Sequence, residues 1–251
     1  MTFADVGVFG GSGFYAFLDD TETVELDTPW GAPSGPITIG SIGDRQVAFL
    51  PRHGVRHEYP PHRINYRANV DAMRRLGVRA LLSPFAAGSL RPEIKRGDFV
   101  VVDQLVDRTW GRESTFYDSF AKSGPQHAAF ADPYDAGLRA HLLEVARDQG
   151  INVHDGGTVV VVNGPRFSTR AESASFRQAG WHVINMTQCP EAPLAREADL
   201  AFAGMALVTD YDTGLEDEPG VEAVTQEQVF AVFEQNVGRV RDLLRAVIPR
   251  L

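Results

Sequence analysis

The sequence offers little from which a disulfide, a structural metal site or a membrane span could be built. Its 251 residues include one cysteine, Cys189, so an intramolecular disulfide is excluded. No Cys and His residues have the spacing of a zinc site, and we expect no metal. The longest apolar run, around Ala201 to Val208, is far shorter than the roughly 18 residues of a transmembrane helix. These absences favour a protein of the reducing cytoplasm.

Positive charge is also scarce. The chain has 24 Lys and Arg residues against 33 Asp and Glu residues, a formal net charge of −9. This balance opposes non-specific attraction to nucleic acid or to an anionic membrane. The N-terminal residues lack the basic region of an export signal, and we expect none. A small-molecule partner fits the composition better.

The chain lacks internal repeats, low-complexity tracts and linker-like stretches, and its length and 43% hydrophobic content predict one α/β domain over residues 1–251. Short apolar runs predict buried strands at Val6 to Phe9, Gln46 to Leu50, Ala80 to Ser83, Phe99 to Val102, Thr158 to Val162, Val183 to Asn185 and Phe202 to Thr209. Helical patterns lie at Tyr66 to Leu76, Ala136 to Asp148, Arg170 to Gln178 and Glu191 to Glu197. This alternation predicts three layers around a mainly parallel sheet.

The last segment, Thr225 to Ile248, has the apolar spacing of one helix face, and Thr225 with Gln228 predicts a capping box. The face consists of Val229, Val232, Phe233, Val237, Val240, Leu244 and Val247. The preceding stretch, Thr213 to Gly220, is acidic and contains glycine, which suggests a mobile lid.

A glycine-rich turn, Gly10-Gly11-Ser12-Gly13, follows the first predicted strand. Glycines bring backbone N–H groups and the Ser12 hydroxyl close to an anion, which favours phosphate binding. A tight turn without a ligand is the alternative. Gly11, Gly13 and Ala16 also fit a dinucleotide fingerprint, but only about nine residues precede the strand-like run Thr23 to Leu26, too few for a crossover helix.

Polar groups follow two further predicted strands. Arg52 and His53 lie just past Gln46 to Leu50, at the sheet edge where ligands usually bind, and Arg52 is suited to a bidentate phosphate clamp. The alternative is a solvated surface turn. Thr187 follows Val183 to Asn185 and offers a hydroxyl and a backbone N–H to an anion, or else caps a helix.

Candidates for base recognition follow two other strands. Phe167 lies in a turn past Thr158 to Val162, where it either stacks on a base or plugs the core. Asp210 and Asp212 end the last apolar run, and carboxylates at i and i+2 of extended backbone face the same ligand edge. The other strand ends lack the acidic partners that a calcium or magnesium site would need.

Six motifs in this order resemble the methylthioadenosine phosphorylase branch of the purine nucleoside phosphorylase family: Gly-Gly-Ser-Gly, Arg-His-Gly, Ala-Gly-Ser-Leu, Gly-Pro-Arg-Phe-Ser, Asn-Met-Thr and Thr-Asp-Tyr-Asp. The resemblance covers essentially the whole chain. It implies a single three-layer α/β domain with a mixed, partly barrel-like sheet of the nucleoside phosphorylase type. It also implies a homotrimer whose active sites take residues from a neighbouring subunit.

Carried over position by position, the resemblance implies a role for each matching residue. Phosphate would be held by Ser12, Arg52, His53 and Thr187, with the backbone at Ala86 and neighbouring Phe85 lining the same region. Phe85 stands where the family commonly has a hydroxyl residue, so one phosphate contact is missing or is made by water. Met186 would lie along the ribose, Phe167 and Ser168 beside the base, and Asp210 and Asp212 at the purine edge.

The 5' pocket departs from the family pattern. Gln226 stands where an apolar residue often contacts the methylthio group, Val229 and Phe230 complete the wall, and His127 matches the residue that reaches a neighbour's pocket. The pocket is therefore expected to be smaller and more polar. A 5'-deoxy or 5'-halo adenosine fits it as well as a 5'-methylthio one, and drift at the pocket rim is the alternative explanation.

The implied reaction is phosphorolysis of S-methyl-5'-thioadenosine, or a related 5'-modified adenosine, to adenine and a 5-modified ribose 1-phosphate. Orthophosphate is a co-substrate, and no cofactor is expected. Asp210 would act as general acid on the base, with Asp212 beside it. A carboxylate accepts from a 6-amino group and repels a 6-oxo group, although 6-oxopurines such as methylthioinosine or inosine remain the alternative. Other classes are a non-catalytic nucleoside-binding protein and a nucleotide-cofactor oxidoreductase.

Overall fold

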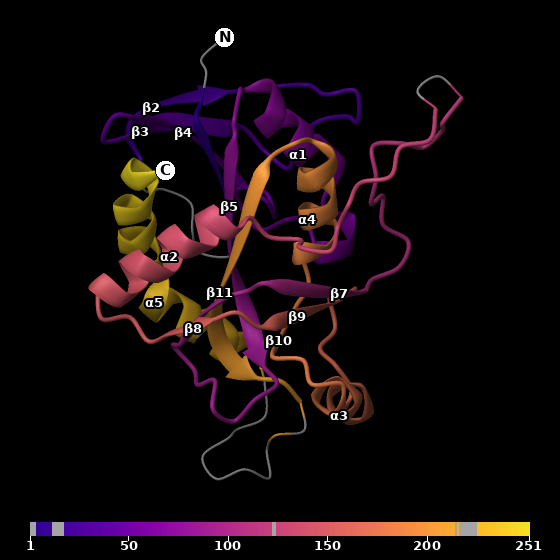
Figure 1. The fold of residues 1–251 in the computed structure, drawn as a ribbon, viewed down its shortest axis with the longest axis vertical. Helices are drawn as coiled ribbons and strands as arrows, with labels where there is room; N and C mark the ends of the chain where they lie inside the picture. Colours follow the sequence, from indigo (N-terminus) through magenta and orange to yellow (C-terminus); the bar gives the residue numbers. More distant parts are fainter. Residues whose placement is uncertain (1–3, 12–17, 122–123, 214, 216–224) are drawn as a thin grey trace.

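The computed structural model describes residues 4–11, 18–121, 124–213, 215 and 225–251. These residues form an 11-stranded sheet with helices on both faces (Figure 1). The strands are β1 (Val6–Gly10), β2 (Asp19–Val24), β3 (Ile37–Ile42), β4 (Arg45–Pro51), β5 (Ala80–Ser89), β6 (Phe99–Val101), β7 (Gln104–Arg108), β8 (Val153–Asp155), β9 (Thr158–Val162), β10 (Val183–Asn185) and β11 (Ala201–Tyr211). The helices are α1 (Tyr66–Arg75), α2 (Ala136–Asp148), α3 (Arg170–Gln178), α4 (Gln188–Glu197) and α5 (Gln226–Val247), with 3-10 turns at Pro61–Arg63 and Ile248–Arg250.

Strand β5 is the centre of the sheet. It pairs in parallel with β11 along its whole length and with β1 at its N-terminal end, and its C-terminal end pairs with β10 in the antiparallel sense. The main path runs β2-β3-β4-β1-β5-β10-β9-β7, and β11 leads on to β6 and β8. The sheet is therefore mixed, as the family resemblance implies. The expectation of a mainly parallel sheet is confirmed, because six strand pairs are parallel. The antiparallel pairs are β2-β3, β3-β4, β5-β10 and β6-β11.

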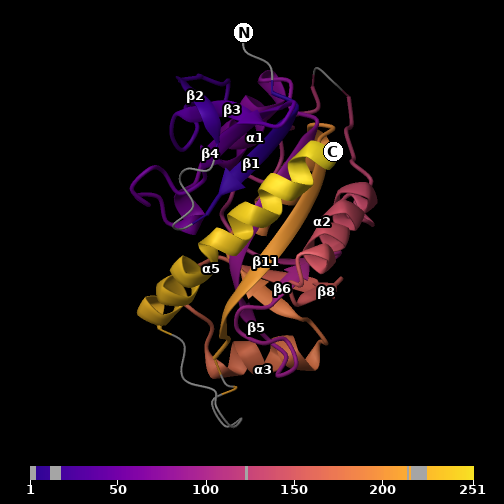
Figure 2. The ribbon, with the colours of Figure 1, turned by 90° about the vertical axis from the view of Figure 1, so that its left-hand side faces the viewer.

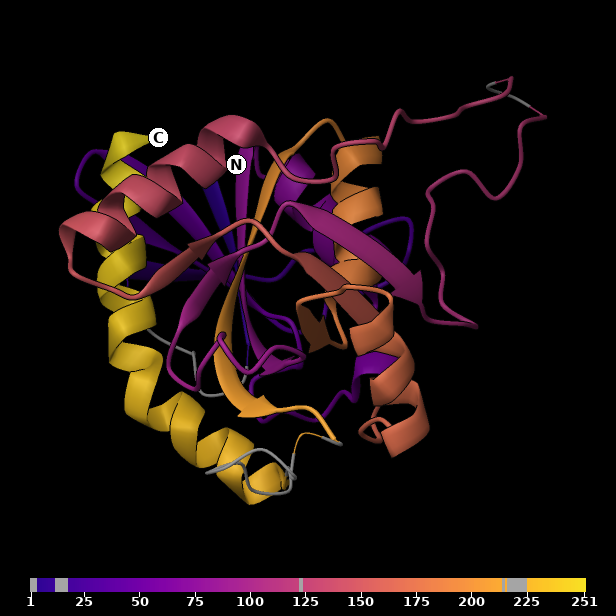
Figure 3. The same cartoon turned by 60° about the horizontal axis from the view of Figure 1, so that its bottom comes forward.

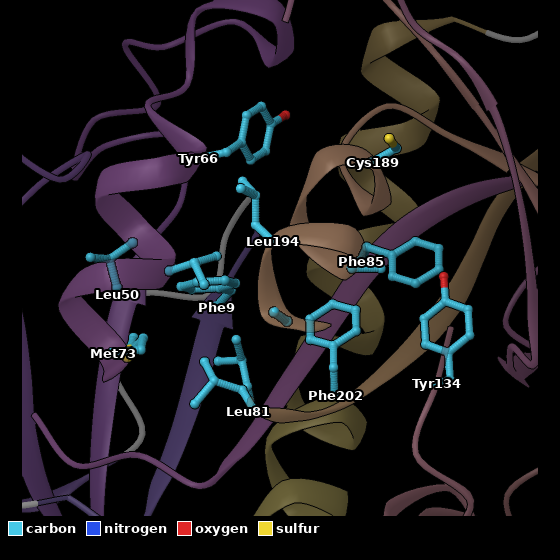
Figure 4. Close-up of a cluster of buried hydrophobic side chains, with 14 of the residues drawn as sticks. Phe9, Leu50, Tyr66, Met73, Leu81, Phe85, Tyr134, Cys189, Leu194 and Phe202 are labelled. Atoms are coloured by element: carbon cyan, nitrogen blue, oxygen red, sulfur yellow. The ribbon is translucent and has the colours of Figure 1, made fainter. Parts of the chain in front are cut away.

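Two hydrophobic cores lie on opposite faces of this sheet. One contains α1 and α4 residues together with Phe9, Leu81 and Phe202, and Figure 4 shows these rings and aliphatic chains packed together. The other lies beneath α2 and α5, which run side by side against β11 (Figure 2). Three layers are the result, because both faces of the sheet bury apolar side chains and need a cover.

Several elements have the bounds predicted from the sequence. β9, β10, α2 and α3 begin and end at the predicted residues. β3, β7 and β8 were not predicted. β7 has an intermediate to exposed burial pattern, and β8 has only three residues, so neither has the apolar signal of a buried strand.

The glycine-rich turn does not open a dinucleotide-binding unit. β2 begins at Asp19 and pairs with β3 in the antiparallel sense, so no crossover helix returns the chain to a parallel neighbour of β1. Ser12 lies outside the described residues, as does most of the suggested lid at Thr213 to Gly220. Among the helices that are described, none has both the length and the apolar character that a bilayer crossing requires.

Helix α5 closes the domain. Its N-cap residue Thr225 accepts a hydrogen bond from the backbone N–H of Gln228 at 3.3 Å. The helix buries Phe233, Val240, Leu243, Leu244 and Val247, while the predicted Val229, Val232 and Val237 are only partly buried. The apolar face is therefore the one predicted, and its C-terminal half contributes most to the core.

The C-terminal half of α5 supplies a stability test. Leu244→Ala removes a side chain that is 1% exposed, and we expect the free energy of unfolding to fall by about 3 kcal/mol. Gln235→Ala, at an exposed position of the same helix, is the control and should change it by less than about 0.5 kcal/mol. Urea denaturation measures both, and equal effects would contradict this packing.

Candidate active site

A cavity of about 380 Å³ gathers segments that lie far apart in the sequence. It is lined at the ends of β1, β4, β9, β10 and β11, along the second half of β5, and by the start of α5. Its walls contain the expected residues Arg52, His53, Phe85, Ala86, Phe167, Ser168, Met186, Thr187, Asp210, Asp212, Gln226, Val229 and Phe230. The sequence motifs thus converge on one site.

His127 is the expected residue that the cavity of this chain does not include. It is exposed and packs edge-on against Phe120, with ring centroids 5.6 Å apart. Both residues lie on a long segment that projects from the body of the molecule (Figures 1 and 3). A residue in this position is remote from its own cavity, and its expected role toward a neighbouring subunit stays a prediction.

Asp210 and Asp212 are both buried where β11 ends. The pairing of β11 with β5 shifts register between Val208 and Asp210, which sets Asp210 opposite Gly88. A Cβ atom at Gly88 would lie 2.9 Å from Asp210 Oδ2, so only glycine fits beneath this carboxyl group. Asp210 Oδ1 accepts a hydrogen bond from the Thr209 hydroxyl at 2.7 Å. Asp210 is one of the residues that line the cavity.

Two buried polar atoms at this end of the cavity have no hydrogen-bond partner within the described part of the chain. They are Asp212 Oδ2 and Ser168 Oγ. An unsatisfied buried polar group costs about 1–3 kcal/mol, and such groups in a cavity wall point to a ligand that satisfies them. A ligand with a hydrogen-bond donor opposite Asp212 would do so.

Burial also changes the acidity of this pair. Burial, opposed by the Thr209 hydroxyl and the charge of Arg96 and assisted by nearby Asp212, raises the pKa of Asp210 to about 6. Burial raises the pKa of Asp212 as well. In the described part of the chain no Arg, Lys or His forms an ion pair with either carboxyl group. Asp210 is therefore able to hold a proton close to neutral pH.

Arg52 lies at the other end of the cavity and is almost completely buried. Its Nε and Nη2 donate to the two carboxylate oxygens of Glu191 at 2.6 and 3.1 Å, and Nη2 also donates to the Ser83 hydroxyl. Its Nη1 donates to the Pro84 carbonyl. The solvated-turn interpretation is therefore wrong. The bidentate phosphate clamp is also wrong, because Glu191 already occupies the guanidinium fork.

One N–H of Arg52 Nη1 keeps no protein acceptor within the described residues, since the guanidinium has five N–H donors and four are used. Nη1 lies beneath the glycine-rich turn, because a Cβ at Gly11 would be 3.2 Å from it. Arg52 thus offers the cavity a fixed positive charge and a single hydrogen bond.

His53 adds an acceptor to this end of the cavity. Its Nδ1 lies 2.9 Å from the Tyr59 carbonyl oxygen, which can only accept, so Nδ1 carries the proton. Burial, assisted by the adjacent His57 and Arg52 and opposed by the Tyr59 carbonyl, lowers the pKa of His53 to about 3. The ring is neutral, and Nε2 presents a lone pair.

Thr187 presents only its hydroxyl group. Its backbone N–H donates to Asn185 Oδ1 at 2.9 Å, so the expectation that this N–H binds an anion is wrong. Its Oγ1 accepts from Asn185 Nδ2 at 3.1 Å, which leaves the hydroxyl proton for another acceptor. Thr187 is also the N-cap residue of α4, but its side chain makes no capping hydrogen bond.

Two of the three phenylalanines that line the cavity, Phe167 and Phe85, have opposite environments. Phe167 is 38% exposed at the cavity rim, so the core-plug interpretation is wrong and its ring is available for stacking. Phe85 is 2% exposed, and its ring belongs to the core near Tyr134 and Phe202 (Figure 4). No hydroxyl replaces the one that the family pattern has at this position.

Glu191 and Ser83 were not predicted as site residues. Both are buried beneath the cavity, where the Ser83 hydroxyl donates to Glu191 and accepts from Gln188 Nε2 and Arg52 Nη2. The one sequence signal was the resemblance of the Pro190-Glu191 stretch to the family. Within the described residues, no group of His, Cys, Asp and Glu side chains could hold a metal ion.

The chain is similar to known proteins in both sequence and fold. The phosphorylase superfamily model matches residues 5–249. The S-methyl-5'-thioadenosine phosphorylase of Mycobacterium tuberculosis is 53% identical over 98% of this chain and 89% of that protein. The purine nucleoside phosphorylase of Streptomyces coelicolor is 50% identical over 99% and 89%. The structure of Schistosoma mansoni methylthioadenosine phosphorylase with adenine superposes with a TM-score of 0.92, at 39% identity over 98% and 91%.

The raised pKa of Asp210 predicts a specific pH dependence of stability. A carboxyl group with a folded pKa of about 6 and an ordinary value of 3.8 stabilises the fold below pH 3.8, and this contribution is lost as the pH rises through 6. Relative to Asp210→Asn, the wild type should lose up to about 3 kcal/mol of unfolding free energy between pH 4 and 7.

Urea denaturation at several pH values measures this difference. Asp44→Asn, at an exposed position, is the control and should run parallel to the wild type. If the Asp210→Asn curve also ran parallel, Asp210 would not be titrating in this range.

Proposed function

The chain belongs to the phosphorylase superfamily, and from that membership and the geometry of the cavity we propose that it cleaves S-methyl-5'-thioadenosine with orthophosphate. The products are adenine and 5-methylthioribose 1-phosphate. The observation that carries the proposal is the polarity of the cavity. Two buried carboxyl groups with raised pKa values lie at one end, and a buried arginine, a hydroxyl group and a neutral histidine lie at the other. Such a cavity suits a base at one end and an anion at the other.

At the purine, the reaction needs a group that donates a proton and a group that accepts a hydrogen bond from the 6-amino group. As the bond between C1' and N9 breaks, its electron pair moves onto the purine, and Asp210 transfers or shares its proton with N7. Asp212 accepts a hydrogen bond from the 6-amino group through its unpartnered Oδ2. A 6-oxo group would place two acceptors face to face, which disfavours inosine-type substrates.

The sugar side is completed by phosphate. One phosphate oxygen forms the new bond to C1' while positive charge develops on the ribose. Arg52 supplies charge to the anion, the Thr187 hydroxyl donates a hydrogen bond, and His53 Nε2 accepts from the hydroxyl of hydrogen phosphate. The Arg52–Glu191 pair fixes the guanidinium, so little reorganisation is needed when phosphate binds.

The 5' substituent would lie against the start of α5. Val229 and Phe230 line the cavity there, and the Phe230 ring is edge-on to His57 with centroids 5.9 Å apart. An apolar methylthio group gains from contact with these side chains. Exposed Gln226 at the rim tolerates a smaller 5'-deoxy or 5'-halo group as a secondary substrate.

Assembly and location complete the proposal. We propose a homotrimer in which His127 of one subunit completes the 5' pocket of the next, because His127 is exposed and does not line the cavity of its own chain. The enzyme would act in the cytoplasm, in purine salvage, where adenine is recovered from a by-product nucleoside.

A substrate panel tests the reaction. With phosphate present, kcat/KM should rank S-methyl-5'-thioadenosine above 5'-deoxyadenosine, 5'-chloro-5'-deoxyadenosine and adenosine, with methylthioinosine at least about 10-fold lower because of acceptor repulsion. Adenine release should stop when phosphate is omitted. Preference for methylthioinosine, or release that does not depend on phosphate, would contradict the proposal.

Asp212→Asn tests base recognition separately. The amide donates where the carboxylate accepted, so kcat/KM for S-methyl-5'-thioadenosine should fall by about 10- to 100-fold while the relative rate on methylthioinosine rises. The exposed Asp44→Asn variant is the control and should leave both rates unchanged. An unaltered ratio between the two nucleosides would exclude Asp212 from reading the 6-position.

A further inference from the structure

Arg112 is an unassigned residue whose side chain reaches behind the cavity. It lies just after β7, at the base of the projecting segment (Figure 3), and it does not line the cavity itself. Its guanidinium is partly buried and stands over the Tyr66 ring, 5.5 Å from the centroid. A charged group held this far from solvent needs acceptors, and Arg112 finds them on two cavity walls.

The first wall is the loop after β9. Arg112 Nη2 donates to the Asn163 carbonyl at 2.7 Å, and Nε donates to the Asn163 side chain at 3.2 Å. Asn163 directly precedes the turn that carries Phe167 and Ser168 into the cavity. Arg112 therefore fixes the backbone from which the proposed base-stacking residue projects.

The second wall is the junction between β10 and α4. Arg112 Nη1 donates to the Met186 carbonyl at 2.9 Å and to the Cys189 carbonyl at 2.7 Å. These carbonyls flank Thr187, whose hydroxyl faces the phosphate end. One planar guanidinium thus joins the base wall to the ribose and phosphate wall.

A third contact connects this group to the opposite rim. One N–H of Arg112 Nη1 is shared with the Tyr66 hydroxyl, 3.2 Å away, and that hydroxyl donates to the Pro61 carbonyl at 2.8 Å. Pro61 lines the cavity. The chain of hydrogen bonds therefore runs behind the site without touching the space that a substrate would fill.

We propose that Arg112 is a positioning residue that holds residues 163–168 and 186–189 in register, so that the base and the phosphate are bound at the separation that the reaction needs. The reaction part of this inference rests on the proposed function. A lysine cannot replace it fully, because an ammonium group is a compact charge and does not span acceptors on two separate segments. A misplacement of about 1 Å between reacting groups is enough to slow a reaction about 100-fold.

The experiment compares Arg112→Met with Arg139→Met. Arg139 is a matched control, since it also joins backbone carbonyls, those of Val101 and Val102, to a second segment through Asp155, and it does not line the cavity. Both variants should lose melting temperature by a similar amount. Only Arg112→Met should raise KM for both nucleoside and phosphate and lower kcat/KM by about 30-fold, with Arg112→Lys recovering part of the loss.

Amide hydrogen exchange gives a readout that does not depend on turnover. In folded protein, Arg112→Met should exchange faster than wild type in residues 163–168 and 186–189, and Arg139→Met should not. If exchange there is unchanged, Arg112 does not hold these segments. If exchange rises while the wild type releases no adenine, the positioning role stands and the proposed reaction fails. A similar change of KM in Arg139→Met would show that Arg112 acts only through the stability of the fold and not by positioning these two segments.

Discussion

The burial of two carboxyl groups at the end of β11 is the constraint on which the site depends. Asp210 and Asp212 are removed from water, and burial raises the pKa of both groups, while the charges of Arg96 and Arg177 oppose the rise. The long pairing of β11 with β5 supplies the rigid backbone that keeps them there, and Gly88 makes the room. Burying these two carboxyl groups lowers the stability of the fold near neutral pH. It also leaves Asp210 able to donate a proton in that pH range.

The opposite end of the cavity buries a positively charged group, Arg52, instead of carboxyl groups. A buried cation is tolerated because Glu191 and Ser83 surround Arg52 with hydrogen bonds, which a buried ion pair needs if its attraction is to compensate for lost hydration. The pair leaves one N–H for a ligand and fixes its direction. Together with the neutral His53, this arrangement favours an anion that carries a proton of its own. The two ends of the cavity therefore differ in both charge and hydrogen-bonding character.

Local patterns predicted the elements with a strong apolar signal, such as α2 and β9, and the order of the motifs predicted which segments line the cavity. They did not predict β7, whose side chains are half exposed, or the antiparallel pairs that make the sheet mixed. The fate of Arg52 could not be foreseen either, because its partner Glu191 lies 139 residues away and only the fold joins them. The links made by Arg112 between separate loops were missed for the same reason. The sequence shows which side chains are present, but which distant side chains contact one another depends on the topology of the fold.

In the proposed reaction, Asp210 holds a proton near neutral pH and shares it with the purine. Carbon-13 NMR of the aspartate carboxyl groups, with Asp210 assigned from the Asp210→Asn spectrum, measures this directly. We expect an Asp210 pKa of about 6 in the free protein and a higher value with adenine bound. A titration near the ordinary value of 3.8 that adenine leaves unchanged would contradict it.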